Sequence, residues 1–290
     1  MCPSQQKQKE NTIELIIDRL GRSPNDFSTQ MRLINERKEK SERWLAAGVL
    51  LLLSHKGEER PAETDNPCSG FVFQLIKRSE RVPQGGDLSC PGGILDPAFD
   101  GVFSRIIRYG LPPVMTGDAR RHAELGGAES LAHTCLFLAN AMREAWEEIR
   151  LSPFNVHYLG ALPCYNLTLF TKTIFPVVGL VKKDNPYRLN GEVDKIVEIP
   201  VSSFFDEKNY AVYSLEASDR IAGNRNGQWE FPCLIHVERN DSEEILWGAT
   251  FNIIISFLTT AFAFDFSRIN PTRVVTGTLE KKYLAGTAIL

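Results

Sequence analysis

Apolar residues are grouped along this chain in short runs, separated by polar segments that contain glycine and proline. The run at 46–53 is unbroken, and its length favours a buried strand over a helix. Residues 70–76 predict a second strand, 157–162 and 171–181 predict two more, and another begins at Trp229. The pattern therefore predicts several strands after residue 45.

Residues 1–45 are more polar, with apolar residues at helical spacing. Ile16 and Leu20 lie on the apolar face of a predicted amphipathic helix, which the segment 21–25 ends. A second, charged helix is predicted at 29–45. No pattern of catalytic residues occurs here, so we interpret residues 1–45 as a helical extension for packing or oligomerisation.

A long apolar-periodic segment starts at Glu129 and predicts a helix. At its C-terminal end, Glu144, Glu147 and Glu148 lie on one helix face because they are three or four residues apart. Carboxylates at this spacing repel one another and cost a few tenths of a kcal/mol per pair. The opposite, buried side is defined by Ala141, Met142, Ala145, Trp146, Ile149 and Leu151.

The acidic cluster has two interpretations. It is either a solvated helix face, which is the common case, or a site for a divalent cation. Hard divalent cations take oxygen ligands, and Mg²⁺ is usually bound together with a substrate phosphate. Arg143 can hold one of the carboxylates through a bidentate contact.

Cationic residues and a glycine pair precede this helix. Lys77, Arg78 and Arg81 follow the second predicted strand and are suited to phosphates, since guanidinium groups make forked contacts. A solvated loop is the alternative. Gly92 and Gly93 allow the backbone to approach a ligand closely, or form a plain tight turn.

Composition argues against several classes of protein. A net charge of −3 and a pI near 6.0 argue against a dedicated nucleic-acid binder. The six cysteines are scattered, which argues against a zinc site. The polar N-terminus does not have the pattern of a signal sequence. We therefore expect a cytoplasmic protein whose thiols are reduced and mostly buried. The apolar run 251–266 is shorter than the roughly 18–20 residues of a membrane span. We expect a buried helix there, with Thr250 as its N-cap, and no membrane partner.

The stretch 143–151 resembles the second half of the Nudix box. The family pattern is Gly, five residues, Glu, seven residues, then Arg-Glu-apolar-x-Glu-Glu-x-Gly-apolar. Pro91-Gly92-Gly93 resembles the opening of this box. The matching positions in the second half are Arg143, Glu144, Ala145, Glu147, Glu148 and Leu151.

The two halves are further apart than in the pattern. Arg143 follows Gly93 by 50 residues (143 − 93), which indicates an insertion at about 94–128. Counting back eight positions from Arg143 gives Cys135 where the pattern has its first Glu, and Glu129 is only a weak substitute. Arg150 replaces the Gly of the pattern, and we expect it to alter the turn rather than the acidic face.

The insertion carries several arginines between proline and glycine breakers. Long segments of this kind inside a domain are often functional or disordered. One interpretation of this insertion is a lid over the site or a collar around the substrate.

A second resemblance points to the coenzyme A diphosphohydrolases of the Nudix superfamily. Leu75, Arg78, Ser79 and Gly86 are similar to residues of the motif that precedes the box in that subfamily, although Cys90 replaces its Phe. Later segments are similar in their order. They are 175–181, 190–200 and 245–250, and the resemblance runs from about residue 46 to 265.

The resemblance implies an α/β Nudix fold over residues 46–290, a mixed β-sheet sandwiched between helices. It implies hydrolysis, with Mg²⁺ or Mn²⁺, of a small-molecule nucleoside diphosphate derivative. Coenzyme A or acyl-CoA is the first expectation, and ADP-ribose, a nucleotide sugar or a dinucleotide the second. We expect a monomer or a homodimer that does not bind nucleic acid.

The resemblance also implies roles for individual residues. Glu144 and Glu148 bind the metal, assisted by Glu147 and a carbonyl of the Gly92 turn. Arg143 orients Glu144. Either Glu144 or Glu192, which follows a turn, takes a proton from the attacking water, and an exposed turn residue is the alternative for Glu192. Substrate is bound by Lys77, Arg78, Arg81 and Gly93.

Two other classes remain open from the sequence. A non-catalytic Nudix-like binding module would account for the displaced first Glu and for Arg150. A plain structural protein would leave the Glu cluster and the Gly92-Gly93 turn as coincidences. Metal titration distinguishes the first alternative, since a binding module should bind its ligand without divalent ions.

Overall fold

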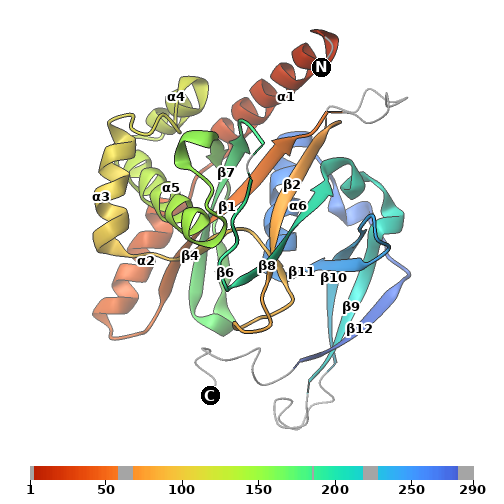
Figure 1. Cartoon of the computed structure of the whole chain (residues 1–290). Coiled ribbons are helices and arrows are strands. Elements are labelled where there is room, and N and C mark those ends of the chain that lie inside the picture. The colour runs from red at the N-terminus through yellow and green to blue at the C-terminus, as the bar shows by residue number, and fades with distance from the viewer. Residues whose placement is uncertain (1–2, 58–67, 185, 218–227, 280–290) are drawn as a thin grey trace.

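The computed structural model describes residues 3–57, 68–184, 186–217 and 228–279, and its centre is a mixed sheet (Figure 1). β1 (Leu45–His55) lies in the middle, antiparallel to β2 (Phe71–Arg78) and parallel to β7 (Lys172–Val181). The remaining strands of this sheet are β3 (Leu88–Ser89) and β8 (Val193–Pro200) beside β2, β4 (Gly92–Ile94) beside β1, and β5 (Val156–Ala161) and β6 (Tyr165–Leu167) beside β7.

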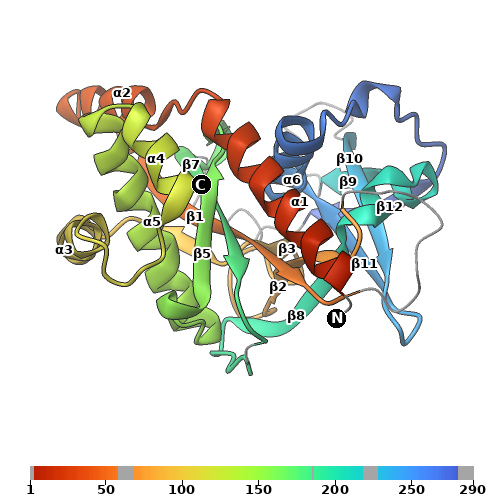
Figure 2. The ribbon, with the colours of Figure 1, turned by 90° about the horizontal axis from the view of Figure 1, so that it is seen from above.

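Helices cover both faces of the sheet (Figure 2). One face carries α2 (Phe27–Glu39), α3 (Pro97–Arg108), α4 (Gly117–Leu125) and α5 (Ala128–Ile149). The other carries α1 (Pro3–Arg22) and α6 (Gly248–Phe262). A mixed sheet between two helical layers is the α/β arrangement that the sequence predicted, so the prediction of the fold class is confirmed.

A second, smaller sheet lies beside α6. Its order is β11 (Glu243–Trp247), β10 (Gln228–Val237), β9 (Tyr210–Ala217) and β12 (Val274–Leu279). β9 and β12 are parallel, and the other pairs are antiparallel. The two sheets meet where β11 approaches β3.

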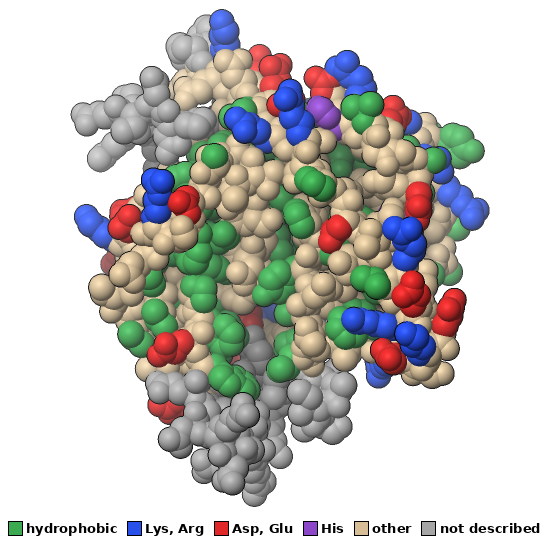
Figure 3. Space-filling view, turned by 180° about the vertical axis from the view of Figure 1, so that it is seen from behind, with side chains coloured by type: hydrophobic (Ala, Val, Ile, Leu, Met, Phe, Trp, Pro, Cys, Tyr) green, Lys and Arg blue, Asp and Glu red, His purple; other side chains and the backbone are tan. Residues whose placement is uncertain are grey.

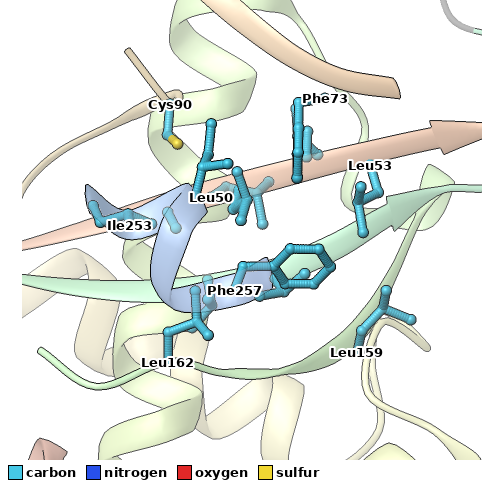
Figure 4. Close-up of a cluster of buried hydrophobic side chains, with 14 of the residues drawn as sticks. Leu50, Leu53, Phe73, Cys90, Leu159, Leu162, Ile253 and Phe257 are labelled. Atoms are coloured by element: carbon cyan, nitrogen blue, oxygen red, sulfur yellow. The ribbon is translucent and has the colours of Figure 1, made fainter. Parts of the chain in front are cut away.

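The core between the main sheet and α6 is aromatic and aliphatic (Figure 4). Phe257 of α6 packs edge-on against Phe73 of β2, with ring centroids 5.6 Å apart. Leu50 and Leu53 of β1 belong to the same buried cluster. Because the apolar side chains of β1 and β2 are withdrawn from water on both faces, their sequences read as near-continuous apolar runs.

Three local predictions were wrong. The second N-terminal helix ends at Glu39 rather than near residue 45, because Leu45 already pairs with Lys172 in the sheet. α6 begins at Gly248, so Thr250 lies inside its first turn and Trp247 is the N-cap. Trp146 is 45% exposed although the helix pattern placed it on the buried side.

The surface carries charges of both signs. On the face in Figure 3, Lys and Arg side chains lie among Asp and Glu side chains rather than in one basic patch. In the described part of the chain, no helix has the length and apolar character needed to cross a membrane. The five cysteines of the described residues are free thiols, and four of them are buried, as expected; Cys2 lies outside those residues.

Candidate active site

The C-terminal half of α5 lies directly against the Gly92-Gly93 backbone. The amide N–H of Gly92 donates a hydrogen bond to Oε2 of Glu148 at 3.1 Å. A Cβ added to Gly93 would lie 2.3 Å from the carboxyl carbon of Glu144. A Cβ on Gly92 would lie 2.4 Å from the carbonyl oxygen of Gly48. Glycine is therefore required at position 92, where the obstacle is backbone, and at position 93 a Cβ would displace the Glu144 carboxylate.

Asn140 fixes the register of α5 on the sheet. Its side chain is fully buried, and its Oδ1 accepts a hydrogen bond from the N–H of Gly48 at 2.6 Å. Its Nδ2 donates to the carbonyl of Ile94 at 3.2 Å. One amide thus joins the helix to β1 and to β4, which places the carboxylates one turn later along α5 beside Gly92 and Gly93.

Asp100 is a partner of Arg143 that the sequence analysis missed. The Arg143 Nε donates to Asp100 Oδ1 at 2.8 Å, and the Asp100 side chain is fully buried. The same guanidinium lies 2.9 Å from Glu144 Oε1 and 3.2 Å from Glu147 Oε2. The hydrogen bond to Asp100 is the main reason why the pKa of Arg143 is raised.

Asp100 lies seven positions after Gly93, close to where the Nudix pattern has its first Glu. The same position counted backwards from Arg143, across the inserted residues, is Cys135. Glu129 is 14 residues before Arg143, about 21 Å along a helix, and cannot replace it. A forward count from Gly93, together with the Asp96-Pro97 helix start, could have found Asp100. Asp100 lies in α3, within the range assigned to the insertion.

Burial and mutual repulsion disfavour the charged forms of Glu144 and Glu148. Desolvation and, to a smaller extent, the charge of Glu144 raise the pKa of Glu148 to about 8, against the hydrogen bond from Gly92, which lowers it. The pKa of Glu144 is also raised, mainly by burial, with Arg143 acting in the opposite direction. Two crowded carboxylates of this kind fit a hard divalent cation, which would favour their ionised forms.

No set of three His, Cys, Asp or Glu side chains converges as a metal site among the residues that the structure describes. Glu147 is half exposed and is turned toward Arg143. A cation held by Glu144 and Glu148 would therefore need backbone, water or substrate oxygens as its remaining ligands.

The loop that carries Glu192 is docked on the end of α5. The N–H of Asn190 donates to the carbonyl of Glu148 at 2.9 Å, and that of Arg188 donates to Ile149 at 3.2 Å. The Glu192 carbonyl accepts from Ser79 N–H at 2.8 Å. The side chain of Glu192 is exposed, and its charge contributes to the raised pKa of Glu148. Glu192 thus lies beside the acidic pair.

Arg150 ends α5 in the left-handed conformation, with φ 56° and ψ 33°. Its N–H donates to Trp146 and that of Leu151 donates to Ala145, which is the Schellman arrangement that glycine favours. The expectation that Arg150 alters the turn was therefore wrong, because Arg150 adopts the same left-handed conformation that a glycine would adopt at this position.

A cleft of about 490 Å³ opens beside Gly92 and Gly93. It lies between β1, β7, the second sheet and the first turn of α6. Its charged lining residues are Arg78, Asp87 and Lys172. Its aromatic lining residues, among those that the structure describes, are Tyr165, Phe170, Trp229, Phe231 and Trp247.

The predicted phosphate-binding cations are separated by the structure. Arg78 lines the cleft. Lys77 lies next to it in β2 but points to the other face, where its Nζ is 2.9 Å from the buried carboxylate of Glu244. Arg81 is exposed and is not among the lining residues. Only Arg78 of the three is thus brought to the cleft.

No protein-family model matches the chain. Among curated proteins, the Nudix hydrolase NudL of Pectobacterium atrosepticum, described as uncharacterized, is 31% identical over 106 residues, 35% of this chain and 54% of that protein. NudL of Escherichia coli O6:H1 is 36% identical over 78 residues, 27% of this chain and 40% of that protein.

Part of this chain is thus similar in sequence to Nudix hydrolases. It matches about half the length, or less, of these relatives. Among solved structures, the Ap4A hydrolase of C. elegans is 12% identical, with 54% of this chain and 80% of that chain covered and a TM-score of 0.32. The NUDIX domain of Shewanella oneidensis NrtR in complex with ADP ribose is 12% identical, with 61% and 85% covered and a TM-score of 0.33.

The predicted insertion, residues 94–128, does not form a collar over the cleft. None of the described residues 94–128 lines it. α3 instead packs along α5 and supplies Asp100, and α4 packs between α1 and α5. The arginines of the insertion therefore lie outside the cleft, contrary to that expectation.

Proposed function

We propose that the protein is a Nudix diphosphohydrolase that cleaves the diphosphate of a nucleoside-linked small molecule. The observation that carries the proposal is the contact of Glu144 and Glu148 with the Gly92-Gly93 backbone beside a cleft lined by Arg78. The similarity in sequence to Nudix hydrolases supports the same chemistry.

Glu144 and Glu148 would hold Mg²⁺ or Mn²⁺. A bound divalent ion of this kind neutralises charge on a diphosphate and lowers the pKa of a water molecule. Arg143 keeps Glu144 in place, and Asp100 in turn keeps Arg143 in place. Glu147 assists by sharing the guanidinium of Arg143.

The remaining residues bind substrate and accept a proton. Arg78 binds a phosphate oxygen at the cleft wall, where a guanidinium can make two parallel contacts. Glu192 is exposed beside the acidic pair and accepts the proton of the attacking water, with Glu144 as the alternative base. No covalent intermediate is needed, since hydrolysis of this kind depends on positioning and charge stabilisation.

The first substrate in this proposal is coenzyme A or an acyl derivative. The motif around Arg78 and Ser79 supports it, and so does the apolar wall of the cleft. ADP-ribose, a nucleotide sugar or a dinucleotide is the second candidate class.

The test is the release of phosphate monoesters from coenzyme A, acetyl-coenzyme A, ADP-ribose, diadenosine polyphosphates and a nucleotide sugar, with Mg²⁺ and with Mn²⁺. Cleavage of coenzyme A to 3′,5′-ADP is the expected result. Cleavage of another diphosphate alone would keep the hydrolase and discard coenzyme A. Ligand binding without turnover of any substrate would favour the non-catalytic binding module.

The variant Glu148→Gln keeps the shape of the side chain and removes its charge. It should lose turnover by at least about 100-fold while remaining folded, because loss of a direct metal ligand removes most of the transition-state stabilisation. Glu124→Gln, an exposed change on α4, is the matched control and should be fully active. Full activity of Glu148→Gln would contradict the metal assignment.

A further inference from the structure

Lys172 is a cleft residue for which the proposed function has no role. It is the first residue of β7, and both Lys172 and Ile174 line the cleft. Thr173 between them is buried on the opposite face, where its Oγ1 accepts from the indole N–H of Trp44 at 2.9 Å. Successive side chains of a strand point to opposite faces. The strand itself therefore directs Lys172 to the cleft.

Lys172 and Arg78 share this cleft without a carboxylate partner in the part of the chain that the structure describes. The Nε of Arg78 donates to the backbone carbonyl of Pro83 at 3.1 Å. Asp87, the carboxylate among the described lining residues, accepts a hydrogen bond from the indole N–H of Trp247 at 3.0 Å.

Other lysines of the molecule are neutralised by acidic residues. Lys77 is paired with Glu244, and Lys195 with Glu238 and Glu244. Lys56 is paired with Asp184 and Glu198. The pair in the cleft thus differs from the other charged clusters of the same sheet.

Two cations brought together out of water repel each other. Burial lowers the pKa of Lys172, and the charge of Arg78 lowers it further. An anion between the two side chains would offset both costs, and a phosphate offers several acceptor oxygens to an ammonium and a guanidinium.

Arg78 and Lys172 line the same cleft as Gly92 and Gly93, and the N–H of Gly92 donates to Glu148. The cleft therefore contains both cations and the backbone that contacts the acidic pair. A diphosphate held at Glu144 and Glu148 would enter this cleft beside Arg78, and Lys172 would remain for a further phosphate.

We propose that Lys172, together with Arg78, binds a phosphate group of the substrate that lies outside the hydrolysed diphosphate. The placement of that diphosphate rests on the proposed function. The additional phosphate is either a monoester on the ribose, as in coenzyme A, or part of a longer polyphosphate chain, as in a dinucleoside polyphosphate. In both cases the substrate carries more negative charge than a simple nucleoside diphosphate ester.

The test is direct binding, measured by calorimetry in the presence of a chelator, so that it does not depend on turnover. 3′,5′-ADP is compared with 5′-AMP, which differs only by the ribose phosphate. Diadenosine tetraphosphate is compared with diadenosine diphosphate, which differs by chain length. The wild-type protein should bind the ligand with additional phosphate at least about tenfold more tightly in one of the two comparisons, and that comparison identifies the source.

The variant Lys172→Met keeps most of the length of the side chain and removes its charge. It should lose the preference and bind 5′-AMP or diadenosine diphosphate as the wild type does. Lys172→Arg should retain the preference. Lys183→Met removes an exposed lysine just beyond the other end of β7, and it should change nothing.

Two results would overturn the inference. One is a wild-type protein that shows no preference in either comparison. The other is a Lys172→Met variant that keeps the preference or weakens all four ligands equally. The ratio of kcat/KM for coenzyme A and dephospho-coenzyme A gives a second readout, and it should fall in Lys172→Met if the ribose phosphate is the ligand.

The failure of this inference differs from the failure of the proposed function. If no diphosphate is hydrolysed but the binding preference depends on Lys172, the phosphate subsite stands and the hydrolase does not. If diphosphates are hydrolysed and Lys172→Met changes neither the binding preference nor the ratio, the hydrolase stands and the subsite does not.

Discussion

At the scale of single residues, the buried contact between Asp100 and Arg143 determines how the acidic cluster is held. Asp100 is fully buried, and Arg143 is only 14% exposed, so the pair is largely shielded from water. The same guanidinium also contacts Glu144 and Glu147. The contact with Asp100 therefore limits how strongly Arg143 interacts with Glu144 and Glu147.

The variant Asp100→Asn should destabilise the protein by about 3 kcal/mol, because removal of one partner leaves a buried charge uncompensated. It should also lower kcat, since Arg143 would shift toward Glu144 and compete with the metal. Urea unfolding and steady-state kinetics are the measurements. Glu147→Gln removes a half-exposed contact of the same arginine and should cost below about 1 kcal/mol. Equal stability of the two variants would contradict the role of Asp100.

Glu148 should make the stability of the metal-free protein fall with rising pH. Its pKa is raised from 4.5 to about 8 in the folded state, mainly by burial. Between these values the folded protein keeps a proton that the unfolded chain has released, so the free energy of unfolding decreases by up to about 1.4 kcal/mol per pH unit. Above about pH 8 both states are ionised, and this contribution is lost.

Urea unfolding at several pH values between 5 and 8, with chelator present, measures this slope. Glu148→Gln should flatten it, whereas Glu147→Gln should leave it unchanged. Added Mg²⁺ should stabilise the wild-type protein more at pH 8 than at pH 5, because the ion binds the deprotonated carboxylate. A slope that persists in Glu148→Gln would assign it to other groups.

At the scale of secondary-structure elements, the end of α5 combines a strained residue with an aromatic contact. Arg150 has a positive φ, which costs a non-glycine residue about 1–2 kcal/mol. Its guanidinium carbon lies 5.5 Å from the centre of the Trp146 ring, a cation–π contact worth about 0.5–1 kcal/mol at an exposed site.

Arg150→Gly should therefore raise the free energy of unfolding slightly, by about 0.5 kcal/mol, because the relief of strain exceeds the lost contact. Arg150→Val should lower it by at least about 1 kcal/mol, since a β-branched residue tolerates a positive φ poorly. Thermal and urea unfolding of both variants provide the comparison. If the glycine variant is the less stable one, the contact with Trp146 outweighs the backbone strain.

The elements that the sequence predicted well are those whose pattern is local. The run at β1 and the periodic segment of α5 contain their own signal of strand or helix. The pairing of Lys77 with Glu244 was not predictable, because it depends on the contact of β2 with a strand 167 residues later in the chain. Lys172 was hidden for a related reason: it is a single charge at the start of an apolar strand, and only the neighbouring strands define the cleft that it lines.

At the scale of the whole molecule, the N-terminal helices are part of the packing around the main sheet. Phe27 is fully buried, and its ring packs edge-on against Phe137 of α5 and Phe175 of β7. Leu20 of α1 lies very close to Gly160 of β5. A Cβ added to Gly160 would be 2.5 Å from the Cβ of Leu20. The boundary between residues 45 and 46 is a prediction from the sequence, and these contacts cross it.

Removal of residues 1–44 should expose the aromatic rings of α5 and β7 and prevent stable folding of the remainder. Full burial of one such side chain is worth about 1.5–3 kcal/mol, so the loss of several would exceed the usual stability of a domain. The measurement is soluble yield and thermal unfolding of the truncated chain. The full-length variant Phe27→Ala should lose about 3–5 kcal/mol. Gly160→Ala should be destabilised as well, because the added methyl group would force α1 away from β5. A truncated chain that melts at the same temperature as the full-length protein would instead show that residues 45–290 fold independently, and that the N-terminal helices are a separable extension.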